Sequence, residues 1–391
     1  MARILKAEGT RPSGPPPAPG ARVANEDHVQ SVSLPDPFVL YRGGRLHGAR
    51  IAYESWGQLN AARDNAILLF TGLSPSAHAA ATAADPTPGW WQRMIGAALA
   101  IDTSRYFVLC INSIGSCFGS TGPASVNPAT GETYRLDFPE VAVEDIARSG
   151  FEVARALGIE RLSAVMGSSL GGSVALAFAA LFPQGTRRVI SISGSPAASA
   201  FAIALRSVQR EAILRDPDWQ HGNYSAERRP LNGMRVARKL GTITYRSATE
   251  WRQRFGRDPI AGLALNPDPF APRFAVEGYL EAQADRFTKV YDPNCYLYLS
   301  RAMDRFDLAE HGGSYRAALA ACGATGGVEQ VLVIGVESDF LYPIHEQAAI
   351  AEAFEQANVA TRFARLPSIE GHDAFLVDIP RFDAEIRAFL G

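Results

Sequence analysis

The stretch that decides the fold is LSAVMGSSLGGSVALAFAALFP, residues 162–183. It begins with a short apolar run (162–166), crosses a glycine-rich turn and continues as an apolar helical run that stops at Pro183. A strand, a tight turn and a helix in this order indicate one unit of a parallel α/β sheet. The turn holds two adjacent serines, Ser168 and Ser169, and the pattern must decide whether either is a nucleophile.

Residues 167–171 read Gly-Ser-Ser-Leu-Gly and fit the G-x-S-x-G pattern with Ser169 at its centre. A serine on a sharp strand-to-helix turn takes a strained backbone, and the residues two before and two after it must be small. Ser168 falls on an x position, because the residues two away from it are Met166 and Leu170. The pattern predicts Ser169 as the nucleophile. The alternative interpretation is a turn where only small residues fit.

Working outward, apolar strand patterns alternate with helical patterns on both sides of this turn. A sheet of this kind, mostly parallel and covered by helices on both faces, is the fold class that we expect. Over residues 199–324 the strand patterns give way to helical patterns rich in Arg, Asp and Tyr, and we interpret this segment as an inserted helical lid. The expected organisation is a Pro/Gly-rich disordered leader (1–34), a core in two pieces (35–198 and 325–391) and the lid between them. The expected strands lie at 65–72, 105–113, 162–167, 187–195, 329–340 and near 361–368, and the expected helices at 144–159, 173–183 and 345–357.

Composition excludes several partner classes. The 391 residues contain 38 Lys and Arg against 40 Asp and Glu, so no basic excess favours nucleic acid or an anionic membrane surface. No run of 18 apolar residues predicts a membrane span, and the N-terminus has no apolar secretory segment. Four cysteines without a CxxC pattern indicate reduced thiols in the cytoplasm and neither a disulfide framework nor a zinc site. We expect no metal and no permanently bound cofactor.

A serine nucleophile needs a base, and the base needs an orienting acid, in the chain order Ser, acid, His. Of the seven histidines, His372 lies in a late loop, SIEGHDAF, that would reach the edge of the sheet where the nucleophile points. The acid should follow the preceding strand, where GVESDFLYP offers Asp339 and, as the less favoured choice, Glu337. The alternative is that either carboxylate caps the next helix.

The oxyanion formed by attack on an acyl group needs two backbone N–H donors. We expect one from Leu170, at the start of the helix behind the nucleophile. The other should come from the segment after the early strand, residues 70–72, and we assign it to Phe70. The alternative is that TGLSPSAH (71–78) is only a flexible connection.

Four separate blocks resemble, in order, the homoserine O-acetyltransferase family: NSIGSCFGSTGPASVNPATG (112–131), MRVARKLGTITYRSATEW (234–251), DPNCYLYLSRAMDRFD (292–307) and GHDAFLVD (371–378). The resemblance covers roughly residues 35 to 390. The family contains acetyl- and succinyltransferases acting on homoserine or serine. It implies an α/β-hydrolase fold with a helical lid and a triad, here Ser169, Asp339 and His372.

The resemblance also implies how substrates are held. Arg238 would bind the carboxylate of the amino acid and Asp373 its ammonium, while Tyr245 would line the site. The acyl donor would be acyl-CoA, either succinyl-CoA or acetyl-CoA, and the protein would be a homodimer. Without the resemblance, Arg238 would be a solvated lid residue and Asp373 a cap of the last helix. A succinyl chain needs a cation, and Arg206, Arg235 and Arg246 are too many to choose among.

Two departures from the family pattern bear on the substrate. The turn that carries the nucleophile, called the elbow below, reads GSSLGG (167–172) instead of GGSMGG. Leucine in place of methionine keeps the side-chain volume and the backbone N–H donor. The early loop reads FTGLSPSAHAA where the commoner acetyltransferases have LTGDSH, so Gly72, Leu73, Ser74 and Pro75 form the expected specificity loop. This form resembles the serine O-succinyltransferase branch, which makes L-serine with succinyl-CoA the first expectation.

Three alternatives stay open at this point. A homoserine O-acetyltransferase or O-succinyltransferase would use the same residues with another acceptor or donor. A carboxylesterase or thioesterase would use the same triad with water as the acceptor. A degenerate hydrolase fold used only for binding is the third, although all three triad positions are filled.

Overall fold

The computed structural model describes residues 29–260 and 268–391. Residues 1–28 of the predicted leader lie outside this part of the chain. Its last residues differ from the expectation, because β1 (Gln30–Ser33) pairs antiparallel with β4 (Arg50–Trp56). The sheet therefore starts before the predicted core boundary at residue 35. Pairing with β4 satisfies the backbone hydrogen-bonding groups of β1, although its sequence, QSVS, has no hydrophobic pattern that would predict a strand.

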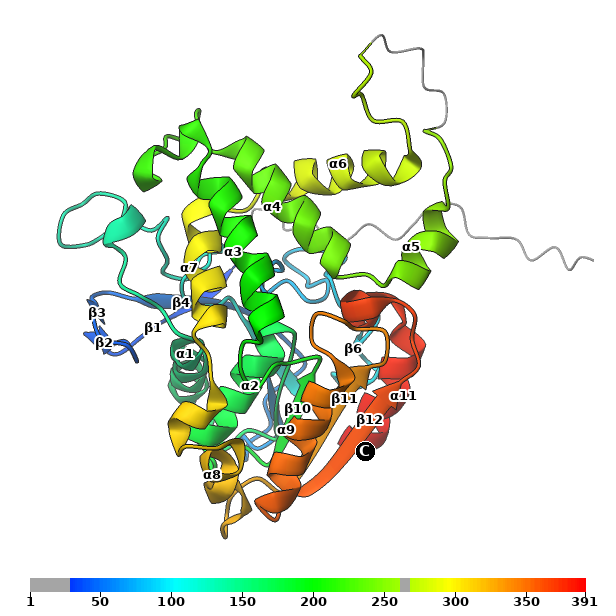
Figure 1. Ribbon diagram of the computed structural model, residues 1–391. Helices are drawn as coiled ribbons and strands as arrows, with labels where there is room; N and C mark the ends of the chain where they lie inside the picture. Colours follow the sequence, from blue (N-terminus) through cyan, green and yellow to red (C-terminus); the bar gives the residue numbers. More distant parts are fainter. Residues whose placement is uncertain (1–28, 261–267) are drawn as a thin grey trace, which may run out of the picture.

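An eight-stranded, mostly parallel sheet forms the centre of the molecule (Figure 1). The strand order is β1-β4-β8-β5-β9-β10-β11-β12, and the six strands from β8 to β12 are parallel. β4 is antiparallel to both of its neighbours, β1 and β8. The predicted fold class is thus confirmed. The remaining strands of the sheet are β5 (Ala66–Phe70), β8 (Phe107–Ile111), β9 (Ala164–Ser168), β10 (Arg188–Ile192), β11 (Gln330–Val336) and β12 (Ala360–Leu366).

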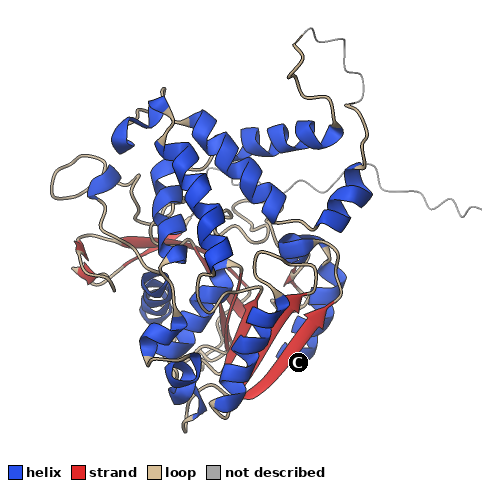
Figure 2. Ribbon diagram, viewed as in Figure 1, coloured by secondary structure: helices blue, strands red, loops and turns tan. Residues whose placement is uncertain are grey.

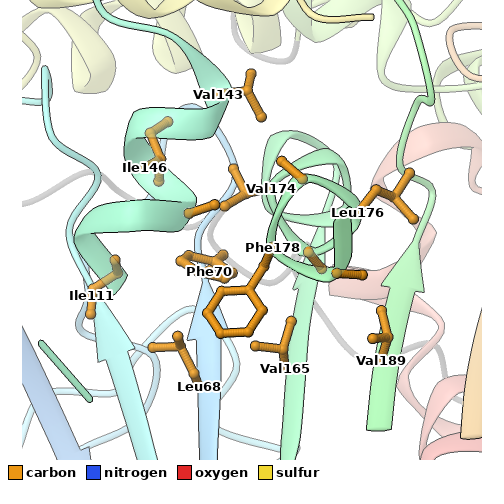
Figure 3. Packing of buried hydrophobic residues seen from close by; sticks show 14 of the residues in the cluster. Leu68, Phe70, Ile111, Val143, Ile146, Val165, Val174, Leu176, Phe178 and Val189 are labelled. Carbon is orange, nitrogen blue, oxygen red and sulfur yellow. The ribbon is translucent and has the colours of Figure 1, made fainter. Parts of the chain in front are cut away.

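Helices cover both faces of this sheet (Figure 2). In β5, Leu68 and Phe70 belong to the core on the side of α1 (Val143–Ala156), α2 (Leu170–Leu181) and α9 (Ile344–Gln356). Ile67 and Leu69 belong to the core on the side of α11 (Ile379–Leu390). Alternate strand residues therefore pack in opposite directions, as a pleated strand buried on both faces requires. Figure 3 shows the Phe178 ring of α2 next to Phe70 and above Leu68 and Val165.

A set of helices lies between β10 and β11 in the chain, and Figure 1 shows α3 to α7 in the upper part of the molecule, with α8 lower down beside the core helices. Its first helix begins after Ser199, whose hydroxyl accepts a hydrogen bond from the Ala202 N–H as an N-cap. The predicted lid range, 199–324, encloses all of these helices. None of the helices within residues 29–260 and 268–391 is long and apolar enough to cross a bilayer. The main lid helices are α3 (Ala200–Leu214), α4 (Leu231–Thr244), α5 (Ala248–Phe255), α6 (Ala275–Thr288), α7 (Pro293–Asp304) and α8 (Tyr315–Leu319).

Short elements complete the chain and lie mostly in its connections. Two pairs of short strands stand apart from the main sheet: β2 (Phe38–Val39) with β3 (Arg45–Leu46), and β6 (Ile95–Gly96) with β7 (Ile101–Asp102). Short 3₁₀-helices are η2 (Arg135–Asp137), η3 (Pro217–Gly222), which is kinked at Gln220 and His221, η4 (Leu308–His311), η5 (Ala320–Gly323) and η6 (Gly371–Asp373), and α10 (Ala374–Val377) follows η6.

The three residues predicted as a triad follow the carboxyl ends of three parallel strands. Ser169 follows β9 directly, Asp339 follows β11, and His372 follows β12 in η6. The carboxyl ends of parallel strands meet at the same edge, which is where open α/β sheets hold their ligands. The lid helices α3 to α7 stand over that edge in Figure 1, and Arg238 and Tyr291 of the lid bond to the loop after β5.

Candidate active site

Ser169 stands on a strained turn between β9 and α2. Its backbone has φ 56° and ψ −120°, a conformation that a residue other than glycine adopts only where the surrounding structure imposes it. The flanking glycines leave no room for a side chain. A Cβ on Gly167 would lie 2.3 Å from the Gly171 carbonyl oxygen, and one on Gly171 would lie 2.2 Å from the Phe70 carbonyl oxygen. The small residues that the pattern requires are therefore forced by backbone contacts on both sides.

The three residues predicted as a triad form one hydrogen-bonded series. The Ser169 Oγ lies 2.8 Å from His372 Nε2, and His372 Nδ1 lies 2.8 Å from Asp339 Oδ2. His372 and Asp339 are 2% and 3% exposed, whereas Ser169 is partly open to solvent. This is the arrangement in which a base removes the proton of a serine hydroxyl while a buried carboxylate orients the base.

The structure separates the two acid candidates. The second oxygen of Asp339 accepts hydrogen bonds from the backbone N–H groups of Leu341 (2.9 Å) and Tyr342 (3.0 Å). These bonds fix the carboxylate, leaving Oδ2 for the histidine. Glu337 is half exposed and lies 3.9 Å from the Arg365 guanidinium on β12. Asp339, not Glu337, therefore contacts the base.

Two opposing effects act on the pKa of His372. Burial by itself lowers it, because the cation loses its hydration. The Asp339 carboxylate outweighs burial through charge and hydrogen bonding, and Asp373 adds to it, so the pKa is raised above its ordinary value. The imidazolium formed during the reaction is thereby stabilised.

Ser168, the other serine of the opening stretch, lies at the end of β9 and is 1% exposed. Its hydroxyl has no hydrogen-bond partner among the described residues. It does not contact His372, which is already bonded to Ser169. The structure therefore brings only Ser169 to the base.

The backbone around the nucleophile carries the predicted oxyanion donors. Leu170 is the first residue of α2, so its N–H belongs to a helix N-terminus, where negative charge is stabilised. Phe70 ends β5 and pairs with Gly167, while its ring packs against Phe178. The next loop passes the nucleophile, since a Cβ on Gly72 would lie 3.9 Å from the Ser169 Cβ. The roles of Leu170 and Phe70 stay predictions.

The residues predicted for the amino acid gather near the base. Arg238, on α4, donates from Nη1 to the Ser74 hydroxyl (3.0 Å), and its guanidinium lies 4.7 Å from the centre of the Phe287 ring. Its Nε has no hydrogen-bond partner among the described residues, although it is buried. The Tyr245 ring lies 5.8 Å from the His372 ring. The Arg238 guanidinium, which has an unused N–H donor, therefore lies against the Phe287 ring.

Asp373 is joined to the lid by its backbone and its side chain. Its N–H donates to the Tyr245 carbonyl (3.0 Å), and its carboxylate lies 3.3 Å from Arg246 Nε. Arg246 also contacts Glu370 (3.0 Å) and Glu250 (3.6 Å). Three carboxylates therefore surround the single guanidinium of Arg246. This cluster of four side chains carries a net negative charge next to the base.

The predicted specificity loop makes two bonds to the lid. The Tyr291 hydroxyl donates to the Leu73 carbonyl (2.9 Å), and Ser74 receives the bond from Arg238. Pro75 folds back on Gly72, where a Cβ would meet its Cδ at 3.7 Å. The loop is therefore an ordered wall of the site, not a free connection.

The three arginines considered for a succinyl carboxylate differ in their surroundings. Arg235 pairs with Glu281 and Asp285, and Arg246 with the acidic group beside Asp373. Arg206 pairs with Asp304, which also binds Arg210, so two buried guanidinium groups share one carboxylate. Arg206 also lines a small cavity next to the nucleophile, whose other walls include Leu170, Ser173, Met303, Phe306 and Tyr342.

Sequence reasoning missed two tyrosines at the site. The Tyr342 ring lies 5.0 Å from the His372 ring at a right angle, and its hydroxyl accepts from Arg206 Nη1 (3.3 Å). Tyr291 holds the specificity loop as described above. Tyr342 is three residues after the triad acid, and that position was the available signal. Tyr291 comes from the lid, and no local pattern connects it to residue 73.

Comparisons with known proteins agree with this geometry. A family model described as alpha/beta hydrolase fold matches residues 65–378. Serine O-succinyltransferase of Litchfieldella anticariensis is 54% identical over 365 residues, covering 93% of this chain and 98% of that protein. The enzyme of the same name from Stenotrophomonas maltophilia is 55% identical over 359 residues, covering 92% and 96%.

Solved structures give the same fold with lower identity. Homoserine O-acetyltransferase from Bacillus anthracis superposes with a TM-score of 0.84 at 28% identity, covering 93% of this chain and 97% of that one. Esterase E22 superposes with a TM-score of 0.83 at 28% identity, covering 93% and 99%. One fold thus supports both transfer and hydrolysis, so the acceptor must be argued from the site.

Proposed function

We infer the reaction of this chain from its family: the chain belongs to the serine O-succinyltransferases, acyltransferases of the α/β-hydrolase fold. The reaction converts succinyl-CoA and L-serine into O-succinyl-L-serine and CoA. The hydrogen-bonded series Ser169–His372–Asp339 is the observation that carries the proposal. The co-substrate is an acyl-CoA, and we propose succinyl-CoA.

The first half of the reaction loads the acyl group onto the enzyme. The Ser169 Oγ attacks the thioester carbonyl while His372 Nε2 takes its proton. The N–H groups of Leu170 and Phe70 stabilise the oxyanion. The C–S bond then breaks, and the imidazolium returns the proton to the CoA thiolate. Succinyl-Ser169 and free CoA thiol are the products of this half.

The second half transfers the acyl group to the amino acid. His372, neutral again, takes the proton from the side-chain hydroxyl of L-serine, and the resulting oxygen nucleophile attacks the ester carbonyl of succinyl-Ser169. The bond to the Ser169 Oγ breaks, and that oxygen recovers the proton from the imidazolium. The Asp339 carboxylate stabilises the imidazolium in both halves without being protonated itself.

Two charged groups support an amino acid instead of water as the acceptor. The planar guanidinium of Arg238 suits bidentate binding of a carboxylate, and its buried Nε offers an unused donor. Asp373, next to the base in the chain, suits the ammonium group. An esterase needs neither charge, so the pair favours transfer over hydrolysis.

The surroundings of the three arginines support Arg206 as the cation for the succinyl carboxylate. Arg206 and Arg210 are both buried and share the single carboxylate of Asp304. Arg206 also lines a small cavity whose walls include Leu170, the residue after the nucleophile, and we propose that the acyl chain on Ser169 extends toward this cavity. A succinyl carboxylate there would give these two guanidinium groups a further anionic partner, which an acetyl group cannot do.

We propose two further properties that the site does not decide. A homodimer formed through the lid is supported by apolar side chains that are half exposed at seven-residue spacing, Phe201 and Val208 on α3 and Val236 and Ile243 on α4. A cytoplasmic location is supported by the four cysteines, all of which are free thiols.

The reaction is tested by combining acetyl-CoA and succinyl-CoA with serine, homoserine or no acceptor, and following the release of CoA thiol. The proposal expects fast turnover only with succinyl-CoA and serine. Faster turnover with homoserine would assign the chain to the other acceptor. Release of thiol at the same rate without any amino acid would indicate a thioesterase.

A further inference from the structure

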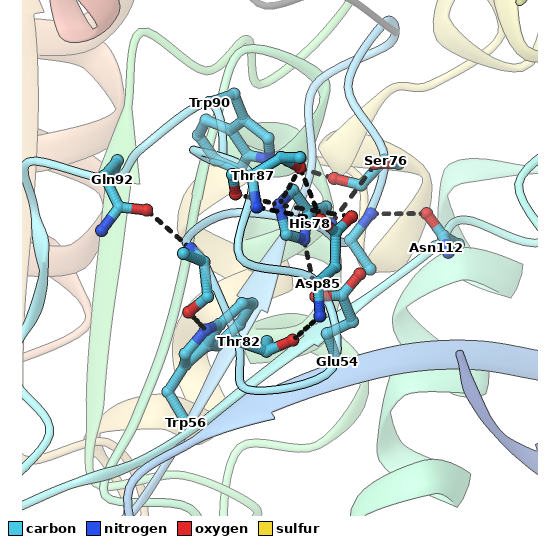
Figure 4. Close-up of polar contacts among 12 residues, drawn as sticks. Glu54, Trp56, Ser76, His78, Thr82, Asp85, Thr87, Trp90, Gln92 and Asn112 are labelled. Carbon is cyan, nitrogen blue, oxygen red and sulfur yellow. Dashed lines mark hydrogen bonds and ion pairs between the residues drawn. The ribbon is translucent and has the colours of Figure 1, made fainter. Parts of the chain in front are cut away.

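A long connection between β5 and β6, residues 71–94, carries the specificity loop and has no helix or strand of its own. Most of it is nevertheless buried or half-buried. Backbone groups buried without regular structure must find other partners, so the side chains that supply them decide the shape of the loop. Figure 4 shows these partners gathered around His78.

His78 joins three segments through its two ring nitrogens. Nδ1 lies 2.9 Å from the Glu54 carboxylate on β4, and Nε2 lies 2.7 Å from the Thr87 carbonyl oxygen, further along the same connection. The Asp85 carboxylate lies 3.8 Å from Nε2 and accepts a hydrogen bond from the Thr87 hydroxyl (2.6 Å). The ring therefore bridges the beginning and the end of the connection and holds both against the sheet.

The partners of His78 determine its protonation. A carbonyl oxygen can only accept, and an ionised carboxylate can only accept, so both ring nitrogens must donate. A neutral imidazole has one N–H, which would leave a ring lone pair facing an oxygen lone pair in a site where His78 and Glu54 are each 13% exposed. The geometry is that of an imidazolium that donates to the Glu54 carboxylate and to the Thr87 carbonyl oxygen, with the Asp85 carboxylate nearby.

The two carboxylates that face this ring favour the cation. Glu54 approaches from β4 and Asp85 from the connection itself. Cys110, which pairs with Glu54 across β4 and β8, is a fully buried thiol whose pKa is raised well above its ordinary value, first by burial. It therefore stays neutral. The hydrogen bond with Glu54 raises the pKa of His78, although burial opposes it.

The segment that His78 holds is bonded to both sides of the active site. The Ala77 N–H, next to His78, donates to Asn112 Oδ1 (2.6 Å), and the Trp90 indole donates to the Ser76 carbonyl (2.9 Å). Three residues before Ala77, Ser74 meets Arg238. At the far end, the Trp91 indole donates to the Phe375 carbonyl (2.9 Å), three residues beyond His372.

We propose that His78, as an imidazolium joining Glu54 to the Thr87 carbonyl, is a positioning residue for the amino-acid acceptor. It holds the connection so that Ser74 meets Arg238 and the acceptor hydroxyl reaches succinyl-Ser169. The inference rests on the proposed function. It concerns the second half of the reaction, because the triad itself is held by other contacts, those of Asp339 with the backbone and of His372 with Asp339.

His78→Gln tests this, since glutamine keeps one donor but cannot carry the charge. The two halves of the reaction are measured separately, by the rapid release of CoA before any acceptor is added and by the decay of succinyl-enzyme with serine. We expect kcat/KM for serine to fall at least about ten-fold, with acylation changed by less than about two-fold, since small misplacements of a reactant cost this much. The selectivity for serine over homoserine should fall as well.

His47→Gln is the matched control. His47 also pairs with a carboxylate, Asp36 at 2.8 Å, but both side chains are more than half exposed and far from the site in the chain. It should leave both halves unchanged. Glu54→Gln removes the charge partner without removing the histidine, and it should give the same acceptor defect if His78→Gln folds poorly. An equal loss in both halves, or no loss in any His78 or Glu54 variant, would overturn the inference.

A spectroscopic readout separates this inference from the proposed function. Histidine ring ¹H–¹⁵N spectra at a pH about one unit above the ordinary histidine value of about 6.5 should show a ring with both nitrogens protonated whose signals are lost in His78→Gln and retained in His47→Gln. A neutral His78 would contradict the inference whatever the activity. Wild-type enzyme that shows no serine-dependent turnover would instead contradict the proposed function.

Discussion

Replacing Asp339 by asparagine should disable the base while leaving the fold intact. The Oδ1 position accepts two backbone N–H groups, from Leu341 and Tyr342. The asparagine must place its oxygen there, since its amide nitrogen would clash with both donors. The NH₂ group then occupies the Oδ2 position, 2.8 Å from His372 Nδ1 in the native enzyme.

This orientation fixes the wrong tautomer. An NH₂ donor facing Nδ1 requires Nδ1 to accept, so the proton of neutral His372 moves to Nε2. Nε2 then cannot accept the proton of Ser169. Loss of the correct tautomer in such a triad costs about 10⁴ in kcat, which corresponds to about 5.4 kcal/mol in the barrier. The surrounding hydrogen bonds are all retained, so the thermal midpoint should change little.

The assay is CoA thiol release in a single turnover with succinyl-CoA, with the thermal midpoint measured on the same sample. Glu337→Gln is the matched control, because it makes the same change two residues away on an exposed side chain, and it should act like wild type. An Asp339→Asn enzyme within about ten-fold of wild type would refute the assignment of Asp339 as the orienting acid. A ten-fold loss raises the activation free energy by only about 1.4 kcal/mol, far less than the expected increase of about 5.4 kcal/mol.

Three further predictions concern the elbow, the acceptor site and the base. Gly171→Ala places a Cβ 2.2 Å from the Phe70 carbonyl oxygen, and its urea midpoint should show a destabilisation of at least about 1–3 kcal/mol. Arg238→Lys keeps the positive charge but loses the planar guanidinium that can bind a carboxylate through two N–H groups, so KM for serine should rise while acylation by succinyl-CoA stays unchanged. Turnover should fall as the pH decreases through the raised pKa of His372, above about 6.5, because only the neutral ring accepts the Ser169 proton; a pH profile without this acid limb would contradict it.

The sequence predicted the core elements well because their signals are local. The run 162–183 contains a complete strand, elbow and helix, and the structure places β9, Ser169 and α2 within it. Chain order then indicated His372 and Asp339, since strands ending at one edge bring late loops to the elbow. β1 was missed because four polar and small residues at a sheet edge lack a hydrophobic pattern.

The parts that the sequence could not predict depend on distant contacts. Three arginines were equivalent in the sequence, and only the pairing of Arg206 and Arg210 with one carboxylate distinguishes them. His78 gave no signal at all, because its partners come from β4 and from residues 85–87. Polar networks of this kind follow from tertiary packing, which residue spacing does not encode.

The most direct test of the account is intact-mass analysis of the enzyme after mixing with succinyl-CoA and no acceptor. The account predicts one succinyl group per chain, located on Ser169, which disappears when L-serine is added and reappears as O-succinyl-L-serine. Ser168→Ala should still be loaded, whereas Ser169→Ala should not. A Ser169→Ala enzyme that still makes the product, or a succinyl group that L-serine does not remove, would contradict covalent transfer through Ser169.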